Sequence, residues 1–180
     1  MRNRLLLALL LVTLALTGCQ ADPSTTGAGT VEPTNCGDVK NMHRVGDLYV
    51  SGAVTPGDFP LLRGLGIETI LNLRKKSETP DMDEAALAEA QGIAYVHVPW
   101  SGASEFTDER IDAMRGVLRD SARPMLFHCG SANRVAAGWL TYRVLDQGVD
   151  LETALSEAKT IGLRSEAYET KALAYIAQNR

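Results

Sequence analysis

The 180-residue sequence has no excess of basic residues and no cluster of metal ligands. Its 18 lysines and arginines are outnumbered by 22 acidic residues, which gives a formal net charge of −4 and argues against a nucleic acid as partner. The three histidines and three cysteines do not form a metal-binding group, so we predict no metal and no cofactor. No internal repeat is visible. A hydrophobic content of 45% instead fits one globular domain with a sizeable core.

A long apolar run is also missing. The run Leu5 to Leu16, close behind a basic start, is too short for an ordinary membrane-spanning helix and is typical of a signal peptide. It ends in Leu16-Thr17-Gly18-Cys19, which resembles the bacterial lipoprotein box. The resemblance implies that residues 1–18 are removed and that Cys19 carries lipid. The protein would then be anchored to a membrane of the bacterial cell envelope, on its periplasmic or outer side. The alternatives are a secreted protein cut elsewhere and a retained anchor helix.

Residues 19–40 are predicted to be the lipidated cysteine and a flexible tether, because they are rich in Thr, Gly, Pro and Ser and have no apolar period. The folded domain is predicted over residues 41–180. Two cysteines, Cys36 and Cys129, would remain without lipid in an oxidising compartment. They could form a disulfide that switches an enzyme off. Alternatively, Cys36 could be an unpaired surface thiol or pair with another chain.

Strands and helices alternate along the predicted domain. Apolar runs predict strands at 47–52, 67–73, 93–98 and 125–127, and periodic patterns predict helices at 55–66, 81–91, 107–118, 135–147, 150–162 and 165–176. This order predicts a single α/β domain with a mainly parallel central sheet and flanking helices. The helix at 135–147 is apolar nearly all round and should be buried. We expect the last two helices to cover one face of the sheet.

The chain is organised around His128-Cys129-Gly130-Ser131-Ala132-Asn133-Arg134, between the strand at 125–127 and the helix at 135–147. A strand, a tight loop and a helix in this order form an anion site from loop amides and the helix N-terminus. The same field stabilises a thiolate, so we predict that Cys129 is a nucleophile. Arg134 supplies a planar fork for two phosphate oxygens. The predicted phosphate-binding residues are Gly130, Ser131, Ala132, Asn133 and Arg134.

Cysteine and arginine with four residues between them resemble the beta-lactamase-hydrolase-like phosphatase family, a bacterial branch of the dual-specificity phosphatase fold. The run from Leu48 to Arg74 is similar to the pattern LYxSGxP…LGIxTxxNLR of bacterial and fungal atypical dual-specificity phosphatases, with Ala53-Val54 in place of Gln-Pro. The resemblance implies a dual-specificity phosphatase-like fold. It also implies hydrolysis of phosphomonoesters, on a protein or a small molecule, through a phosphocysteine intermediate and without a cofactor.

Two features depart from that family, and two other functions remain open. The family places an aspartate before the cysteine as general acid; Asp108 and Glu105 lie in the corresponding region, but there is no Trp-Pro-Asp, and Asp108 could serve only the helix dipole. Val135 replaces the usual hydroxyl residue after the arginine, which argues against fast hydrolysis of the intermediate.

The loop length also matches single-domain rhodaneses, so a sulfurtransferase is an alternative. The second alternative is a catalytically inactive, anion-binding lipoprotein.

Three further features concern access to the predicted site. Arg74, Lys75 and Lys76 follow the strand at 67–73, where they could attract an anionic substrate or form a solvated loop. The loop 100–106 is expected to set pocket depth and so substrate choice. His97 is interpreted as a hydrogen-bonded core or edge histidine rather than a base.

Overall fold

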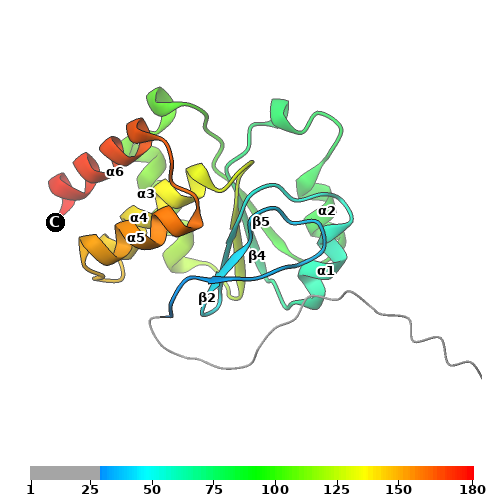
Figure 1. Ribbon diagram of the computed structural model, residues 1–180. Coiled ribbons are helices and arrows are strands. Elements are labelled where there is room, and N and C mark those ends of the chain that lie inside the picture. The colour runs from blue at the N-terminus through cyan, green and yellow to red at the C-terminus, as the bar shows by residue number, and fades with distance from the viewer. Residues whose placement is uncertain (1–28) are drawn as a thin grey trace, which may run out of the picture.

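The computed structural model describes residues 29–180 (Figure 1). The predicted signal peptide, Cys19 and the first part of the predicted tether lie outside the described residues. The strands are β1 (Glu32–Pro33), β2 (His43–Val45), β3 (Leu48–Ser51), β4 (Thr69–Asn72), β5 (Ala94–His97) and β6 (Met125–His128). The helices are α1 (Asp58–Gly64), η1 (Lys76–Glu78), α2 (Glu84–Ala90), η2 (Ala103–Glu105), α3 (Asp108–Asp120), α4 (Asn133–Leu145), α5 (Leu151–Ile161) and α6 (Glu166–Asn179).

The six strands form one sheet in the order β1-β2-β3-β6-β4-β5. The pairs β3–β6, β6–β4 and β4–β5 are parallel, whereas β1 and β2 are antiparallel additions at one edge. The predicted α/β fold with a mainly parallel sheet is therefore confirmed. Strand β6 lies in the interior of the sheet, hydrogen-bonded on both sides, and it leads directly into the cysteine loop.

Helices cover both faces of the sheet, with α1 and α2 on one side and α3 to α6 on the other (Figure 1). Side chains of β6 alternate between the two layers: Met125 and Phe127 join the core under α3 to α6, and Leu126 joins the core under α1 and α2. Successive residues of a strand point to opposite faces, so a strand covered on both sides must be apolar throughout. This explains the uninterrupted apolar run before the cysteine loop.

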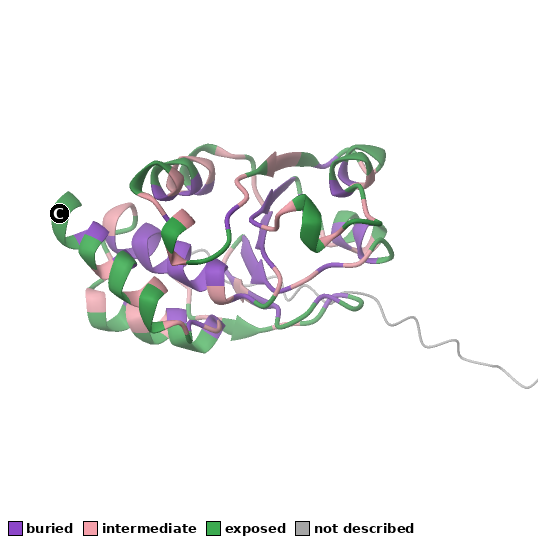
Figure 2. Ribbon diagram, turned by 90° about the horizontal axis from the view of Figure 1, so that it is seen from above, coloured by how far each residue is buried: buried purple, intermediate pink, exposed green. Residues whose placement is uncertain are grey.

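Helix α4 is the most deeply buried helix of the domain. Apart from its first and last residues, Asn133 and Leu145, all of its residues are buried, because α3, α5 and α6 pack around it. Its predicted burial is confirmed, and α5 and α6 lie on this face of the sheet as expected. In Figure 2 the strands at the centre are mostly buried, whereas the outer turns of the surrounding helices are exposed. The cysteine loop is thus attached at one end to a fully buried strand and at the other to the most deeply buried helix.

The folded domain begins earlier than the sequence predicted. Residues 32–40 are not a tether: β1 pairs with β2, and Cys36 and Val39 are buried in the core under α1 and α2. The backbone N–H of Asp38 also donates to Asp58 at 2.7 Å. Two isolated buried side chains in a Pro- and Gly-rich stretch give no periodic signal, which is why the prediction was wrong.

The hypothetical disulfide between Cys36 and Cys129 is also wrong, because Cys129 is a free thiol. Cys36 has only 1% of its surface exposed, so it is not a surface residue either. Among residues 29–180, no helix combines the length and the apolar character needed to cross a membrane.

Helix α1 starts at Asp58 rather than directly after Thr55. The buried carboxylate of Asp58 accepts hydrogen bonds from the backbone N–H of Thr55 at 2.7 Å and from its hydroxyl at 2.9 Å. Thr55 and Asp58 therefore pair with each other in the turn that precedes the helix.

Candidate active site

Cys129 stands at the point where three parallel strands end. It follows β6 directly, its side chain is fully buried, and its thiol is free. Its backbone N–H donates to Ser51 of β3 at 3.3 Å, and the carbonyl of His128 accepts from Leu73, just after β4, at 3.0 Å. Ligands of parallel α/β sheets bind beyond the carboxyl ends of the strands. The structure therefore places the predicted nucleophile where the fold offers a site.

The loop from Cys129 to α4 turns sharply at Ala132. This residue adopts the left-handed conformation, with φ at 65° and ψ at −9°, and α4 begins at the next residue. The loop amides are thereby followed at once by the unpaired N–H groups of a helix N-terminus, an arrangement that binds anions. The side chains of Ser131 and Asn133 contact the turn between α5 and α6, and Gly130 is half-buried.

Arg134 lies in the first turn of α4 with its guanidinium group fixed by several acceptors. Nη1 donates to the carbonyls of Leu73 at 3.0 Å and Trp100 at 2.6 Å. Both terminal nitrogens donate to the carboxylate of Glu78, Nη1 at 2.8 Å and Nη2 at 2.6 Å. Arg134 is 9% exposed. The arginine that the sequence singled out is thus held in one place before any substrate arrives.

The Arg134–Glu78 pair lies against the cysteine loop. A Cβ atom at Gly130 would lie 3.4 Å from Nη2 of Arg134 and 3.6 Å from Oε1 of Glu78. Burial alone would lower the pKa of Arg134, but the hydrogen bonds to Glu78 and the charge of Cys129 raise it overall. Burial would raise the pKa of Glu78, but Arg134 and the backbone N–H of Lys75 lower it overall. Both partners are therefore charged at neutral pH.

Glu78 is a site residue that the sequence analysis missed. It belongs to η1, a single short turn in the loop after β4. Its backbone carbonyl also accepts from Arg74 at 3.0 Å. No periodicity marks an acidic residue in such a loop. The available signal was only its position beyond the carboxyl end of a predicted strand.

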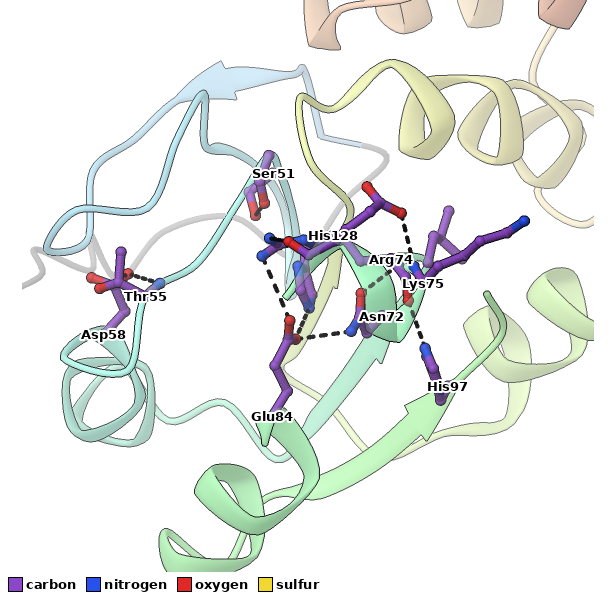
Figure 3. A network of polar contacts seen from close by, with 12 residues as sticks. Ser51, Thr55, Asp58, Asn72, Arg74, Lys75, Glu84, His97 and His128 are labelled. Carbon is purple, nitrogen blue, oxygen red and sulfur yellow. Dashed lines mark hydrogen bonds and ion pairs between the residues drawn. The ribbon is translucent and has the colours of Figure 1, made fainter. Parts of the chain in front are cut away.

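A second missed feature is a buried polar network on the other side of the sheet from α4 (Figure 3). The carboxylate of Glu84, at the start of α2, lies 3.2 Å from Nε2 of His128 and accepts from Asn72 at 2.9 Å. Arg74 lies 3.6 Å from the other carboxylate oxygen. The side chains of Glu84 and His128 are 3% and 0% exposed. The network joins α2 to the residue that precedes the nucleophile.

The basic cluster after β4 is largely neutralised. Arg74 points inward to Glu84, and Nζ of Lys75 lies 2.5 Å from Glu105. Lys76 is exposed and lines a pocket of about 190 Å³ on the α2 side. The cluster is therefore neither a fully solvated loop nor three free cations.

The two general-acid candidates differ in their surroundings. Asp108 is the exposed first residue of α3, the position of a carboxylate that interacts with a helix dipole. Glu105 accepts from Lys75 and from the backbone N–H of Ser101 at 2.8 Å, and these hydrogen bonds lower its pKa. His97 behaves as predicted, with its Nε2 2.6 Å from the carbonyl of Arg74.

Aromatic packing anchors the loop 100–106 to α6. The rings of Trp100 and Phe106 stack at 4.5 Å, and Tyr168 of α6 meets Trp100 edge-on at 5.1 Å. Since the carbonyl of Trp100 accepts from Arg134, this loop also fixes the arginine.

A parallel α/β sheet that ends in a buried free cysteine, a tight loop and a helix carrying a fixed arginine defines the tyrosine and dual-specificity class of phosphatase folds. Residues 41–145 match the family described as "Beta-lactamase hydrolase-like protein, phosphatase-like domain". Because the match spans more than half of the chain, the chain belongs to this family of phosphatase-like domains.

Individual proteins agree with this assignment. A curated beta-lactamase hydrolase-like protein of Agrobacterium fabrum is 29% identical over 119 residues, which are 64% of this chain. The chain spans only 26% of that relative's length. The fold resembles TpbA from P. aeruginosa, with a TM-score of 0.63, 23% identity and coverage of 84% of this chain and 91% of that one. It also resembles the catalytic core of SIW14 from S. cerevisiae, with a TM-score of 0.63, 20% identity and coverage of 83% and 93%.

Proposed function

We propose that this protein hydrolyses phosphomonoesters with Cys129 as the nucleophile and Arg134 as the phosphate-binding cation. The observation that carries the proposal is the position of the free thiol at the end of β6, beside a guanidinium group whose pKa responds to the charge of that sulfur. The thiolate is the reactive form of a cysteine nucleophile.

The reaction proceeds in two steps. Sγ of Cys129 attacks phosphorus, an S–P bond forms, and the P–O bond to the leaving alcohol breaks while that oxygen takes up a proton. Water then attacks phosphorus, the S–P bond breaks, and inorganic phosphate leaves with the thiolate restored and one proton released to solvent, which balances the proton taken up by the alcohol. The loop amides of residues 130–134 bind the equatorial oxygens, whose charge increases in the transition state.

One edge of Arg134 is not used by Leu73, Trp100 or Glu78. A guanidinium group has five N–H donors, and here the two of Nη1 and one of Nη2 point to Leu73, Trp100 and Glu78. The remaining N–H of Nη2 and that of Nε lie on the same side of the planar group. They can donate together to two phosphoryl oxygens, so Glu78 orients the arginine without competing for the edge that binds substrate.

The comparisons support a phosphorylated substrate without selecting one. A solved complex of TpbA contains pTyr, and SIW14 is described as a PP-IP phosphatase. The two neighbours are thus associated with different chemical classes of phosphorylated compound.

The proposal is tested by hydrolysis of p-nitrophenyl phosphate, with thiosulfate plus cyanide as the assay for the sulfurtransferase alternative. Cys129→Ser should abolish phosphate release but keep vanadate binding, whereas Arg134→Ala should weaken both. Near-normal hydrolysis by Cys129→Ser would show that the nucleophile is misassigned. Thiocyanate formation without phosphate release would favour the rhodanese-type reaction, and vanadate binding without turnover of either substrate would favour an inactive anion-binding protein.

We also propose that Cys19 is lipidated and anchors the domain to the cell envelope. Support comes from the Leu16-Thr17-Gly18-Cys19 sequence behind a short apolar run. Expression in a bacterial host with radiolabelled palmitate tests this. Label should appear in the full chain and disappear in Cys19→Ala, and an unlabelled full chain would contradict the anchor.

A further inference from the structure

The turn between α5 and α6 brings a second arginine to the cysteine loop. The guanidinium group of Arg164 donates from Nη2 to the hydroxyl of Ser131 at 2.7 Å. A longer contact of 3.4 Å joins its Nη1 to the Ser131 carbonyl. Ser131 is one of the four loop residues between the proposed nucleophile and Arg134 in the sequence, so Arg164 lies at the rim of the proposed phosphate site.

Backbone contacts fix this turn independently of the Arg164 side chain. The backbone N–H groups of Arg164 and Ser165 donate to Oδ1 of Asn133 at 2.9 and 3.3 Å. A Cβ atom at Gly162 would lie 3.6 Å from both Ala132 Cβ and the Ser131 carbonyl. The turn therefore packs directly on the loop, and a substitution of the Arg164 side chain leaves these contacts in place.

The charge of Arg164 is not neutralised by the domain. The guanidinium groups of Arg134 and Arg164 both lie beside the cysteine loop. Arg134 is paired with Glu78. Arg164 is exposed, its side chain contacts only neutral oxygens, and no carboxylate of the described residues lies within ion-pair distance of it. An arginine that keeps free donors and full charge beside a phosphate site is suited to bind a second anionic group.

We propose that Arg164 is a specificity residue that binds a second phosphate of the substrate, so that the preferred substrates are phosphomonoesters carrying another phosphate nearby. This rests on the proposed phosphatase reaction. The shared chemistry is a pair of phosphates on one molecule, either a polyphosphorylated small molecule or a doubly phosphorylated peptide. The first phosphate is bound by the loop and Arg134, and the second extends along the rim to Arg164.

The experiment measures kcat/KM for two matched substrate pairs. One pair is inositol monophosphate and inositol hexakisphosphate; the other is one peptide carrying a single phosphate and the same peptide carrying phosphates on adjacent residues. Each is assayed with the wild type, Arg164→Gln, Arg164→Lys and Arg63→Gln. Arg63 is an exposed arginine of α1, on the opposite face of the sheet, so Arg63→Gln removes the same charge far from the loop.

The wild type should prefer the multiply phosphorylated member of at least one pair, and that pair identifies the source of the second phosphate. Arg164→Gln should reduce the preference about tenfold or more, because a hydrogen bond between charged groups is worth about one to two powers of ten in affinity. Arg164→Lys should retain part of it, and Arg63→Gln all of it.

A preference that is equal in Arg164→Gln and the wild type, or absent from the wild type, overturns the inference about Arg164 while the phosphatase reaction stands. Absence of Cys129-dependent phosphate release from all four substrates and from p-nitrophenyl phosphate overturns the proposed function instead.

Discussion

Glu78 and Arg134 form a bidentate ion pair against the cysteine loop, with N–O distances of 2.6 and 2.8 Å. The pair connects the short turn after β4 to the first turn of α4. A long arginine side chain normally loses conformational freedom when it binds a phosphate. Here most of that loss has already occurred on folding, and this is the form of preorganisation that favours electrostatic catalysis.

Glu78→Gln should therefore lower kcat/KM for p-nitrophenyl phosphate by about tenfold, which corresponds to roughly 1.4 kcal/mol of lost transition-state binding. Glutamine keeps the size of the side chain but loses the charge and one acceptor oxygen. The matched control is Ser77→Ala, which changes the exposed neighbouring residue of η1. Equal rates for the two variants would show that the ion pair does not orient Arg134.

The same pair makes stability depend on pH. The pKa of Glu78 is lowered in the folded state from its ordinary value of 4.5. Its stabilisation is therefore fully present above about pH 4.5 and is lost as the pH falls through the lower folded-state value. The side chain is 32% exposed, so the pair should contribute only about 1 kcal/mol. Urea denaturation of the wild type and Glu78→Gln should show this difference at pH 7 and a smaller one at pH 3.5. A difference that grows in acid would contradict the ion pair.

Glu84→Ala should destabilise the domain by about 3 kcal/mol or more, because it leaves Arg74 and His128 beside an empty space in a buried network. The control is Glu89→Ala, an exposed position on the same helix, which should change stability by less than about 0.5 kcal/mol. Thermal denaturation measures both. A small effect of Glu84→Ala would show that the network contributes little to stability.

Ala132→Gly and Ala136→Gly make the same chemical change in opposite backbone environments. At position 132 glycine relieves a left-handed conformation that costs an alanine about 1 kcal/mol, which offsets its extra flexibility in the unfolded chain. At position 136, inside α4, glycine has no such advantage and costs about 1 kcal/mol. Chemical denaturation should therefore find Ala132→Gly the more stable variant. The reverse order would mean that the loop does not turn at Ala132.

Most of the fold was predictable because its signals are periodic. The apolar strand 125–127, the apolar helix after Arg134 and the alternation of elements all follow from burial on one or two faces. The hairpin of β1 and β2 was not predictable, since its strands have two and three residues. Such short strands carry too few side chains to show alternation.

The candidate site was predictable only where one segment contains it. Cys129 and Arg134 lie in a single short segment of the sequence, so their spacing was visible. Glu78, Glu84 and Arg164 reach the loop or its neighbouring residues from other parts of the chain. Their roles depend on the strand order, which places η1, the start of α2 and the α5–α6 turn near the carboxyl ends of the central strands. Glu84 is also a buried charge, and charged residues are normally expected at the surface.

The most direct test of the central claim is to trap the intermediate. The protein is mixed with p-nitrophenyl phosphate radiolabelled at phosphorus, quenched in acid within the first turnovers, and digested for peptide mapping. We predict label on the peptide that contains Cys129 and none in Cys129→Ser. Phosphate release with the label on another residue, or undiminished release in Cys129→Ser, would contradict the account.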